Sequence, residues 1–435
     1  MSFSNVQSRI LDPVFDRKGL RVEFRLPADS AFLSDLRLIN IGVSSDNADD
    51  SPNPLLGVMA SIKKISILDG STLLDQINVA PIYNAFRNAN QVNDSNLSMN
   101  RFLKYVRNGY VFQGDYTINA GNQMDIGPPL IKEQNPQTYA TSSLNAKRAW
   151  ISLKDLLPFL RSSLVLPTTI FSQLKVVVEY NSSAELKFLT TKSDATKESS
   201  EDALLLCEEI MDGDMKDRLM SAYKGVAYRP IEHELVVADK VDPNSSLANV
   251  AGQATREQRN RYLLTGANGK KLIKIAVVQT PTDSSTWLNT NDVVANGDVG
   301  SVAQYKTGVQ FIVNGVAKLP FSGMTASTTG SYANRRLAYL NDSWGIFNII
   351  NNQNAINLST HRTQNYLETP ELIGQQDYIG LLIDDNISEL QLEYNRTGVV
   401  GNANLLQQLN LNIFYEVEKA VVVNSNGTYN VVYTQ

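Results

Sequence analysis

The sequence is poor in the residues on which most active sites depend. It contains one cysteine, Cys207, and two histidines, His233 and His361, among 435 residues. A single cysteine excludes an internal disulfide and a cysteine-based zinc site. The two histidines lie in different halves, so a Ser/His/Asp or Cys/His catalytic site has almost nothing from which to form. Cys207 follows Leu204–Leu206, and we expect a small buried apolar residue rather than a reactive thiol.

Long apolar runs and clustered positive charge are missing as well. No stretch approaches the roughly 20 apolar residues that a membrane helix requires. The N-terminal region carries Arg9, Asp12, Asp16, Arg17 and Lys18 in place of an apolar signal segment, so we expect synthesis in a cytosol-like compartment. The formal net charge is −5, with 39 basic against 44 acidic residues. This balance argues against a protein that coats nucleic acid, which needs clustered lysine and arginine.

One glycine-rich loop partly matches a phosphate-binding motif. In Gly266–Lys270, however, Leu264 occupies the position of the first glycine, and Lys271 stands where the motif has serine or threonine. A turn with solvated lysines is the simpler interpretation. His233 lies between Glu232 and Glu234 in a strand-like run, which places it on the opposite face from both. A surface or hydrogen-bonded histidine is favoured there over a catalytic one.

An acidic loop and several glycosylation triplets also have simpler interpretations. Asp46–Asp50 suggests calcium, but an EF-hand loop would need an oxygen ligand at Ala48, glycine at Ser51 and a carboxylate at Gly57. Triplets of the form Asn-x-Ser/Thr are interpreted as by-products of Asn-rich loops; they include Asn181, Asn395 and Asn426. We therefore predict no catalytic, cofactor-binding or metal-binding residues and no cofactor. A carboxylate pair for glycoside hydrolysis stays open, because such pairs form in space rather than in sequence.

What the chain has instead is a hydrophobic period of two. Leu409, Leu411, Ile413, Tyr415 and Val417 alternate with mostly polar residues, which is typical of a strand with one buried face. The same pattern predicts further strands, at 22–26, 62–68, 174–180, 272–278, 309–313 and 390–394. Long polar connections separate them, at 44–54, 88–100, 281–300 and 325–334. Loops of this length usually form functional surfaces.

Two short helices and a hairpin complete the expected elements. Helical patterns occur at 153–160, which Pro158 allows only if it lies in the first turn or beyond the helix, and at 214–223. Residues 421–433 predict a hairpin whose turn draws positive φ angles from Asn426 and Gly427. Residues 203–210 fit either a buried strand or an amphipathic helix.

One segment occurs twice. Ile170-Phe-Ser-Gln-Leu-Lys-Val176 matches Leu405-Leu-Gln-Gln-Leu-Asn-Leu411 in pattern, at an offset of 409 − 174 = 235 residues. In both copies an apolar pair, a polar pair and a leucine lead into an alternating strand. A repeat of this kind indicates two similar β-domains, and the length of the chain also favours two or three domains. We place the boundary near residue 228, where a new strand begins at Tyr228-Arg-Pro-Ile-Glu-His.

Several segments, read in order, resemble the double jelly-roll major capsid proteins of the adenovirus-like lineage, close to those of polinton-like viruses and virophages. Leu20–Pro27 with Leu33–Leu38 resembles the opening strand pair. Ile62–Gln76 with Tyr83–Phe86 resembles a strand and glycine-turn signature. Trp150–Tyr180 is similar to the end of the first jelly roll. The crossing between barrels and the closing strands are matched by 204–210, 228–232 and 409–433.

This resemblance implies an all-β fold of two tandem eight-stranded jelly-roll barrels, at 1–228 and 229–435, with long loops and a few short helices. It implies a strand at 204–210. It also implies a non-enzymatic capsid protein whose homotrimers form pseudo-hexagonal capsomers that tile an icosahedral shell. Expected partners are copies of the chain itself, penton proteins and minor capsid proteins, without sequence-specific nucleic-acid binding. The expected location is the virion, after synthesis in the host cytoplasm or a viral factory.

Two other classes remain open. The first alternative is a two-domain β-sandwich that binds carbohydrate or a receptor, such as an attachment protein. Trp287, in a polar loop, is the best candidate for stacking on a sugar, although core packing or loop anchoring is the commoner role. A glycosidase on a β-scaffold comes third. A monomer that binds glycans would favour the first alternative, whereas trimers that tile would favour the capsid.

Overall fold

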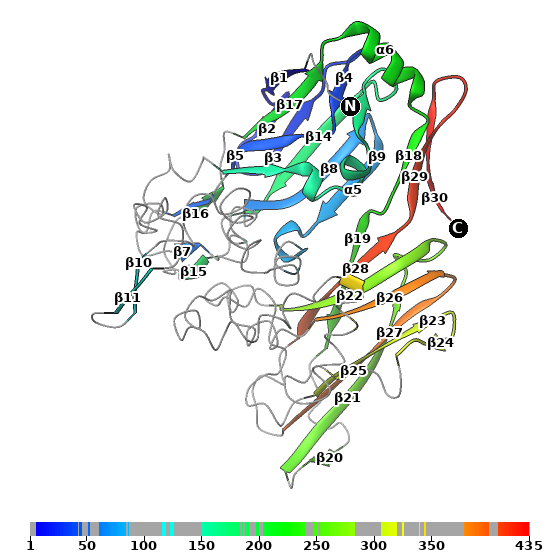
Figure 1. Ribbon diagram of the computed structural model, residues 1–435. Coiled ribbons are helices and arrows are strands. Elements are labelled where there is room, and N and C mark those ends of the chain that lie inside the picture. Colours follow the sequence, from blue (N-terminus) through cyan, green and yellow to red (C-terminus); the bar gives the residue numbers. More distant parts are fainter. Residues whose placement is uncertain are drawn as a thin grey trace. The chain divides into compact units, whose positions relative to one another are not determined.

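The structure of the chain is a computed structural model (Figure 1). The structure describes residues 6–41, 43–45, 51–52, 61–83, 86, 115–118, 122–125, 149–182, 185, 188–190, 197–199, 203–239, 247–250, 253–282, 306–319, 324–325, 339, 343–344, 378–399 and 408–434.

The chain forms two compact units. The first unit is built from Met1–Asn84, Ser95–Ile231 and Glu418–Thr434, and the second from Ala85–Asp94 and Glu232–Val417. These units differ from a simple division at residue 228, because the C-terminal hairpin belongs to the first unit. The physical reason is strand pairing: residues 419–422 of β29 (Lys419–Val423) pair with the whole of β18 (Gly225–Tyr228). The assignment of residues 1–228 and 229–435 to two jelly rolls stays a prediction.

One large sheet of the first unit is centred on β17 (Leu204–Ile210). β17 pairs on one edge with β1 (Val6–Leu11), and on the other with β4 (Ala31–Leu33) and β5 (Arg37–Ile41). Outside them run β12 (Ala149–Ser152) beside β5 and β13 (Val165–Pro167) beside β4. Two short helices join β12 to β13, η4 (Leu153–Asp155) and α5 (Pro158–Ser162). Pro158 lies in the first turn of α5, where its missing N–H costs no hydrogen bond.

The second large sheet of the first unit has the strand order β2-β3-β14-β8-β9. Its strands are β2 (Phe15–Arg17), β3 (Arg21–Arg25), β14 (Leu174–Tyr180), β8 (Ile62–Asp69) and β9 (Thr72–Asn78). Leu174, Val176, Val178 and Tyr180 are all buried, which confirms the predicted inward face of β14. Gly70 makes the β8–β9 turn with φ +58, a conformation that glycine adopts without steric cost.

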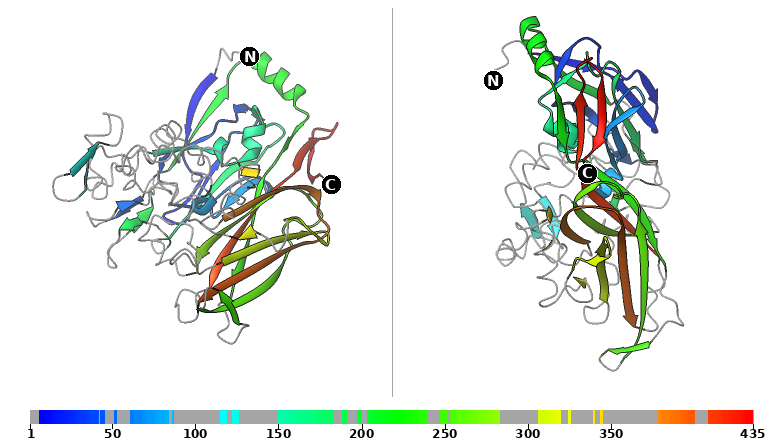
Figure 2. Two further views of the ribbon diagram at one scale, coloured as in Figure 1. Left: turned by 60° about the horizontal axis from the view of Figure 1, so that its bottom comes forward. Right: turned by 90° about the vertical axis from the view of Figure 1, so that its right-hand side faces the viewer.

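A three-stranded sheet of β18, β29 and β30 (Tyr429–Tyr433) completes the main part of the first unit (Figure 2). The hairpin at 421–433 is confirmed, but its turn differs from the expectation. Only Gly427 of the expected pair has positive φ, +82, and its N–H donates to the carbonyl of Asn424. A longer loop with one left-handed residue replaces the two-residue turn, so Asn426 needs no strained backbone.

Smaller elements of the first unit are one helix and three strand pairs. The helix α6 (Gly213–Ala222) confirms the prediction at 214–223, and the side chain of Asp212 caps it by accepting from the N–H of Met215. The pairs are β6 (Val43–Ser45) with β16 (Lys197–Ser199), β7 (Ser51–Pro52) with β15 (Phe188–Thr190), and β10 (Asp115–Ile118) with β11 (Asn122–Asp125).

The second unit also contains two large sheets. One has the order β19-β28-β22-β26, formed by β19 (Ile231–Ala238), β28 (Leu409–Val417), β22 (Lys271–Pro281) and β26 (Tyr378–Asn386). The other joins β20 (Leu247–Val250), β21 (Gln253–Leu264), β27 (Leu390–Val399), β23 (Lys306–Val313), β24 (Val316–Ala317) and β25 (Met324–Thr325). Side chains from both sheets share one core, including Ile275, Ile413, Phe311 and Leu392. This is the arrangement of a β-sandwich.

The predicted repeat is visible as a repeated strand neighbourhood. β14 begins at Leu174 and β28 begins at Leu409, which preserves the offset of 235 residues. Each lies between an earlier and a middle strand of its own unit: β14 between β3 and β8, and β28 between β19 and β22. In each unit the strand and its two neighbours belong to the same sheet. The repeated sequence segment therefore marks equivalent strands of two similar units. Among the described residues the main sheets hold six and five strands in the first unit and six and four in the second. Eight strands for each barrel are therefore not confirmed.

Candidate functional site

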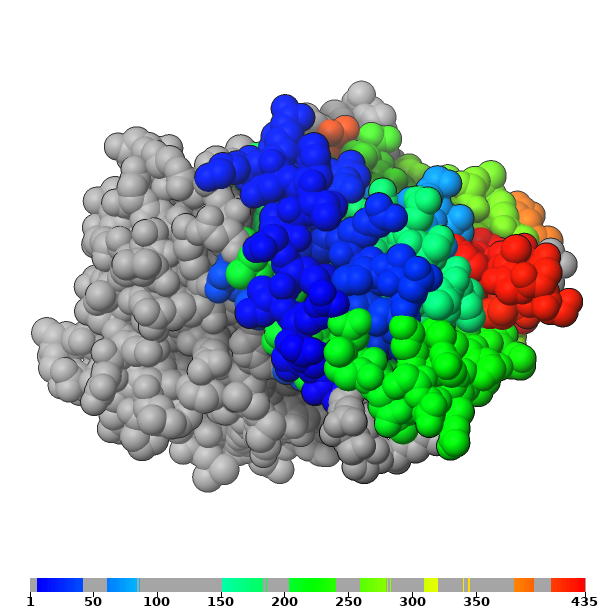
Figure 3. Space-filling view, turned by 90° about the horizontal axis from the view of Figure 1, so that it is seen from above, coloured from blue at the N-terminus to red at the C-terminus, as the bar shows by residue number. Residues whose placement is uncertain are grey.

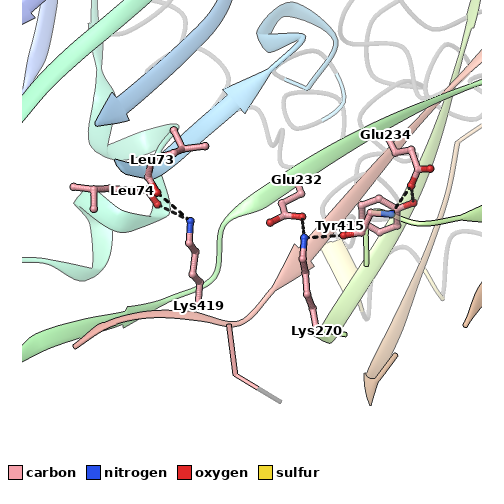
Figure 4. Close-up of polar contacts among 8 residues, drawn as sticks. Leu73, Leu74, Glu232, Glu234, Lys270, Tyr415 and Lys419 are labelled. Carbon is pink, nitrogen blue, oxygen red and sulfur yellow. Dashed lines mark hydrogen bonds and ion pairs between the residues drawn. The ribbon is translucent and has the colours of Figure 1, made fainter. Parts of the chain in front are cut away.

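The loop that partly matches a phosphate-binding motif is occupied by a carboxylate of the chain itself. The backbone N–H groups of Thr265 and Gly266 donate to Glu234 at 3.3 and 3.0 Å, and the phenol of Tyr415 donates to the same side chain at 2.6 Å (Figure 4). A Cβ at Gly266 would lie 3.0 Å from both Glu234 and Tyr415, so glycine permits this approach. The amides that a phosphate would need are bonded to Glu234, which makes this cluster structural.

The lysines of this loop are ion-paired rather than simply solvated, which corrects the sequence interpretation. Lys270 donates to Glu232 at 2.5 Å and to the carbonyl of Gly266 at 2.8 Å (Figure 4). Lys271 lies 3.6 Å from Asp384. The pair between Lys270 and Glu232 fastens the loop to β19.

His233 is a hydrogen-bonded structural residue, as the sequence favours. Its Nε2 lies 3.0 Å from the side-chain oxygen of Asn412, and its ring lies 5.3 Å from that of Phe414. Burial lowers the pKa of His233, against the opposing effect of Asn412 and Glu234. Burial thus disfavours the charged form of the imidazole, which lies on the side of β19 that contacts Asn412 and Phe414. The other histidine, His361, lies outside the described residues, as do Asp46–Asp50 and Trp287.

Cys207 is buried in β17, which agrees with the expected apolar role. Burial raises the pKa of its thiol to about 11, although the charge of Arg9 opposes the shift. A thiol of this kind has little thiolate near neutral pH and is a poor nucleophile. Asn181 is also buried, and its backbone N–H donates to the carbonyl of Ser61, so this triplet does not present a glycosylation site.

A second polar cluster, in the first unit, escaped the sequence analysis. The ammonium of Lys419 donates to the carbonyls of Leu73 and Leu74 at 3.4 and 3.2 Å (Figure 4). Asp75, the next residue of β9, is buried and accepts from the N–H of Phe159 at 2.8 Å. A lone aspartate within a strand and a lysine near the C-terminus carry no motif, so only the tertiary structure joins them.

The described residues show neither a cluster of metal ligands nor a membrane-spanning helix. Within the described part of the chain, no three His, Cys, Asp or Glu side chains gather as a metal site would require. None of the helices described reaches the length and hydropathy of a membrane-spanning segment.

Several apolar side chains are exposed among the described residues of the first unit. Its N-terminal strands and their turn expose Ile10, Val14, Phe15 and Leu20. Figure 3 shows this N-terminal region (blue) at the surface, on the same face as the segment around α6 (green) and the C-terminal hairpin (red). No side chain of α6 is fully buried. Exposed apolar groups on strands are suited to association with another protein surface.

Comparisons by sequence identify no relatives: no family model matches the chain, and no curated protein matches it. Comparison by structure finds matches to 69 chains of known structure.

The structural matches extend over nearly the whole chain. VP54 of the virus PBCV-1, fitted into a reconstruction of the virophage Sputnik, matches with a TM-score of 0.55 and 11% identity, over 100% of this chain and 98% of that chain. The structure of the Sputnik virophage itself matches with a TM-score of 0.53 and 10% identity, over 100% and 89%. The Faustovirus major capsid protein matches with a TM-score of 0.51 and 10% identity, over 96% and 90%.

Matches at identities this low establish the fold alone, but they establish it for both units at once, because the three matches cover 96–100% of the chain. The two strand-rich units, the repeated strand neighbourhood and these matches all indicate a fold of two similar β-domains. The chain has the fold of the double jelly-roll major capsid proteins of the Sputnik virophage, PBCV-1 and Faustovirus.

Proposed function

We propose that this protein is a capsid protein whose homotrimers form pseudo-hexagonal capsomers of an icosahedral virus shell. The observation that carries the proposal is the structural match over 100% of this chain and 98% of VP54. A shared fold alone does not prescribe a function. A second observation supports the proposal: the polar clusters found among the described residues are structural rather than catalytic. The protein is proposed to act in the virion and not as an enzyme.

The number of barrels in each chain favours a trimer. Two similar jelly rolls in one chain, at residues 1–228 and 229–435 with the C-terminal hairpin returning to the first, give six similar barrels in a trimer. Six similar barrels around one axis approach sixfold symmetry and can tile a hexagonal lattice. Neighbouring capsomers are the first expected partners, followed by penton and minor capsid proteins. Exposed apolar residues such as Ile10 and Phe15 are available for contacts of this kind.

Native mass spectrometry of the purified protein at low micromolar concentration tests this proposal. We expect a homotrimer that resists dilution, because a permanent interface buries roughly 2,000 Å² or more. Negative-stain images should show pseudo-hexagonal particles. A monomer at every salt concentration, especially one that binds glycans, would contradict the capsomer and support an attachment protein instead.

A further inference from the structure

The C-terminal hairpin is fastened to the first unit at two points. At one end Lys419 donates to the carbonyls of Leu73 and Leu74. At the other end the phenol of Tyr429 donates to Asp69 at 2.8 Å, and its ring lies 5.0 Å from that of Phe171. These contacts are made with β8 and β9 or beside them, and β9 is the edge strand of its sheet. The hairpin therefore lies against this edge.

β9 is the last strand in its sheet, and its carbonyls are bonded by side chains from the three-stranded sheet. Tyr228 of β18 donates its phenol to Leu74, the carbonyl that Lys419 also contacts. An open strand edge is thereby covered. Lys419 is itself buried, at 7% exposure, and its ammonium lies 5.3 Å from the ring centre of Tyr433.

Asp75 lies at the centre of this attachment. Its carboxylate accepts from the N–H of Phe159, at the start of α5, and from the N–H of Gln76, each at 2.8 Å. The charged groups around it are Lys419 from β29 and Arg161 from α5, while Tyr228 of β18 contributes a phenol at the neighbouring carbonyl. A carboxylate with 1% exposure is costly to ionise, even with these partners.

Burial raises the pKa of Asp75 to about 7. The N–H groups of Phe159 and Gln76 and the charges of Lys419 and Arg161 all act in the opposite direction, but desolvation is the largest effect. Asp75 therefore changes charge near neutral pH, directly beside the residues that hold the hairpin.

We propose that the C-terminal hairpin, residues 418–434, is a strap that loosens from the first unit when Asp75 ionises. The proposal goes beyond the capsid function and does not depend on it. Opening of the strap would let water reach Asp75 and would remove the largest obstacle to its charge. Ionisation and opening therefore favour each other by linkage.

The direction in which pH changes the stability of the closed state follows from the direction of the pKa shift of Asp75. A carboxyl group whose pKa is raised in the closed state binds its proton more tightly there than in the open state. The closed state is most stable below the ordinary pKa of about 3.8, and this advantage is lost as pH rises to about 7. Lys419 limits the loss, because its positive charge favours ionised Asp75 in the closed state.

Hydrogen exchange of the full-length protein tests the strap. The amides of β29 report opening, and those of β14 serve as an internal reference that cancels the intrinsic effect of pH. Between about pH 5 and about pH 7, we expect the protection of β29 relative to β14 to fall by up to about fiftyfold, because each pH unit between the ordinary pKa of about 3.8 and the raised pKa of about 7 contributes a factor of about ten and the effect levels off near pH 7. Asp75→Asn should keep β29 protected equally over this range, because its side chain carries no charge.

Two further variants separate charge at the strap from charge elsewhere. Lys419→Met removes the compensating ammonium, so the decrease in protection should become larger and extend to higher pH. Lys63→Met removes an exposed partner of Glu185 in the same unit and should behave like the natural protein. A relative protection of β29 that is independent of pH in the natural protein would overturn the proposal. So would an unchanged pH dependence in Asp75→Asn.

Discussion

Tyr415 and Glu234 meet across a 2.6 Å hydrogen bond, with the phenol as donor, although 181 residues separate them in the chain. Tyr415 is fully buried in the core of the second unit, and Glu234 extends from β19. The same carboxylate accepts from the loop amides of Thr265 and Gly266. One acidic side chain thus joins two strands and a loop.

Tyr415→Phe should destabilise the second unit by about 1–3 kcal/mol, because a buried hydrogen bond to a charged group is lost while the ring is kept. Burial and the bond to Glu234 both raise the pKa of Tyr415, so the phenol stays protonated. Chemical denaturation monitored in the second unit measures the effect. An unchanged midpoint would show that Glu234 is satisfied without Tyr415.

Gly225 and Gly427 form a matched pair for testing the hairpin. Gly225 has φ +114, and a Cβ there would lie 2.0 Å from the carbonyl oxygen of Val421, so Gly225→Ala should displace β29 from β18 and cost several kcal/mol. Gly427 has φ +82 and open space around it, so Gly427→Ala should cost only about 1 kcal/mol of backbone strain. Thermal unfolding of both variants decides, and equal losses would contradict the close approach of β18 and β29.

Val176 and Lys175 test the two sides of β14. Val176 is completely buried, so Val176→Asp should place an unpaired carboxylate in the core and cost several kcal/mol. The Lys175 side chain is 29% exposed and lies 3.8 Å from Glu23, so Lys175→Asp should cost far less, mainly through repulsion between carboxylates. The yield of soluble folded protein compares them. Equal losses would mean that the register of β14 is wrong.

Cys207 should resist thiol reagents in the folded protein. Burial and the raised pKa, about 11, leave little thiolate at about pH 8. Labelling should therefore follow the rate of unfolding, and denaturant should accelerate it strongly. Rapid labelling of the folded protein would show that β17 opens locally.

Chelator treatment should leave thermal stability unchanged, since we predict no metal-binding residues in this chain. The same melting experiment on Cys207→Ser tests whether the thiol is needed for folding or assembly, and we expect it is not. A clear drop in stability on chelation would direct attention to the acidic loops.

Local sequence patterns are sufficient to predict the individual strands and their repetition. Alternation of apolar residues located β14 and β28, because a period of two is a local property of a half-buried strand. The offset of 235 residues in the sequence indicates, without knowledge of strand pairing, that β14 and β28 are equivalent. For residues 204–210 local pattern was insufficient, and the strand followed only from resemblance to capsid proteins; pairing with β1, β4 and β5 confirms it.

The unit to which the last strands belong, and the charged groups that they bury, depend on contacts between residues far apart in the sequence. Lys419 reaches Leu74 across 345 residues of sequence, and β29 pairs with β18 of the first unit. No local pattern encodes such a contact, because the free energy of burying Lys419 and Asp75 depends on neighbours that only the folded chain supplies. Strand formation depends largely on residues that are close in sequence, whereas the ionisation of a buried carboxylate depends on all the groups that surround it in space.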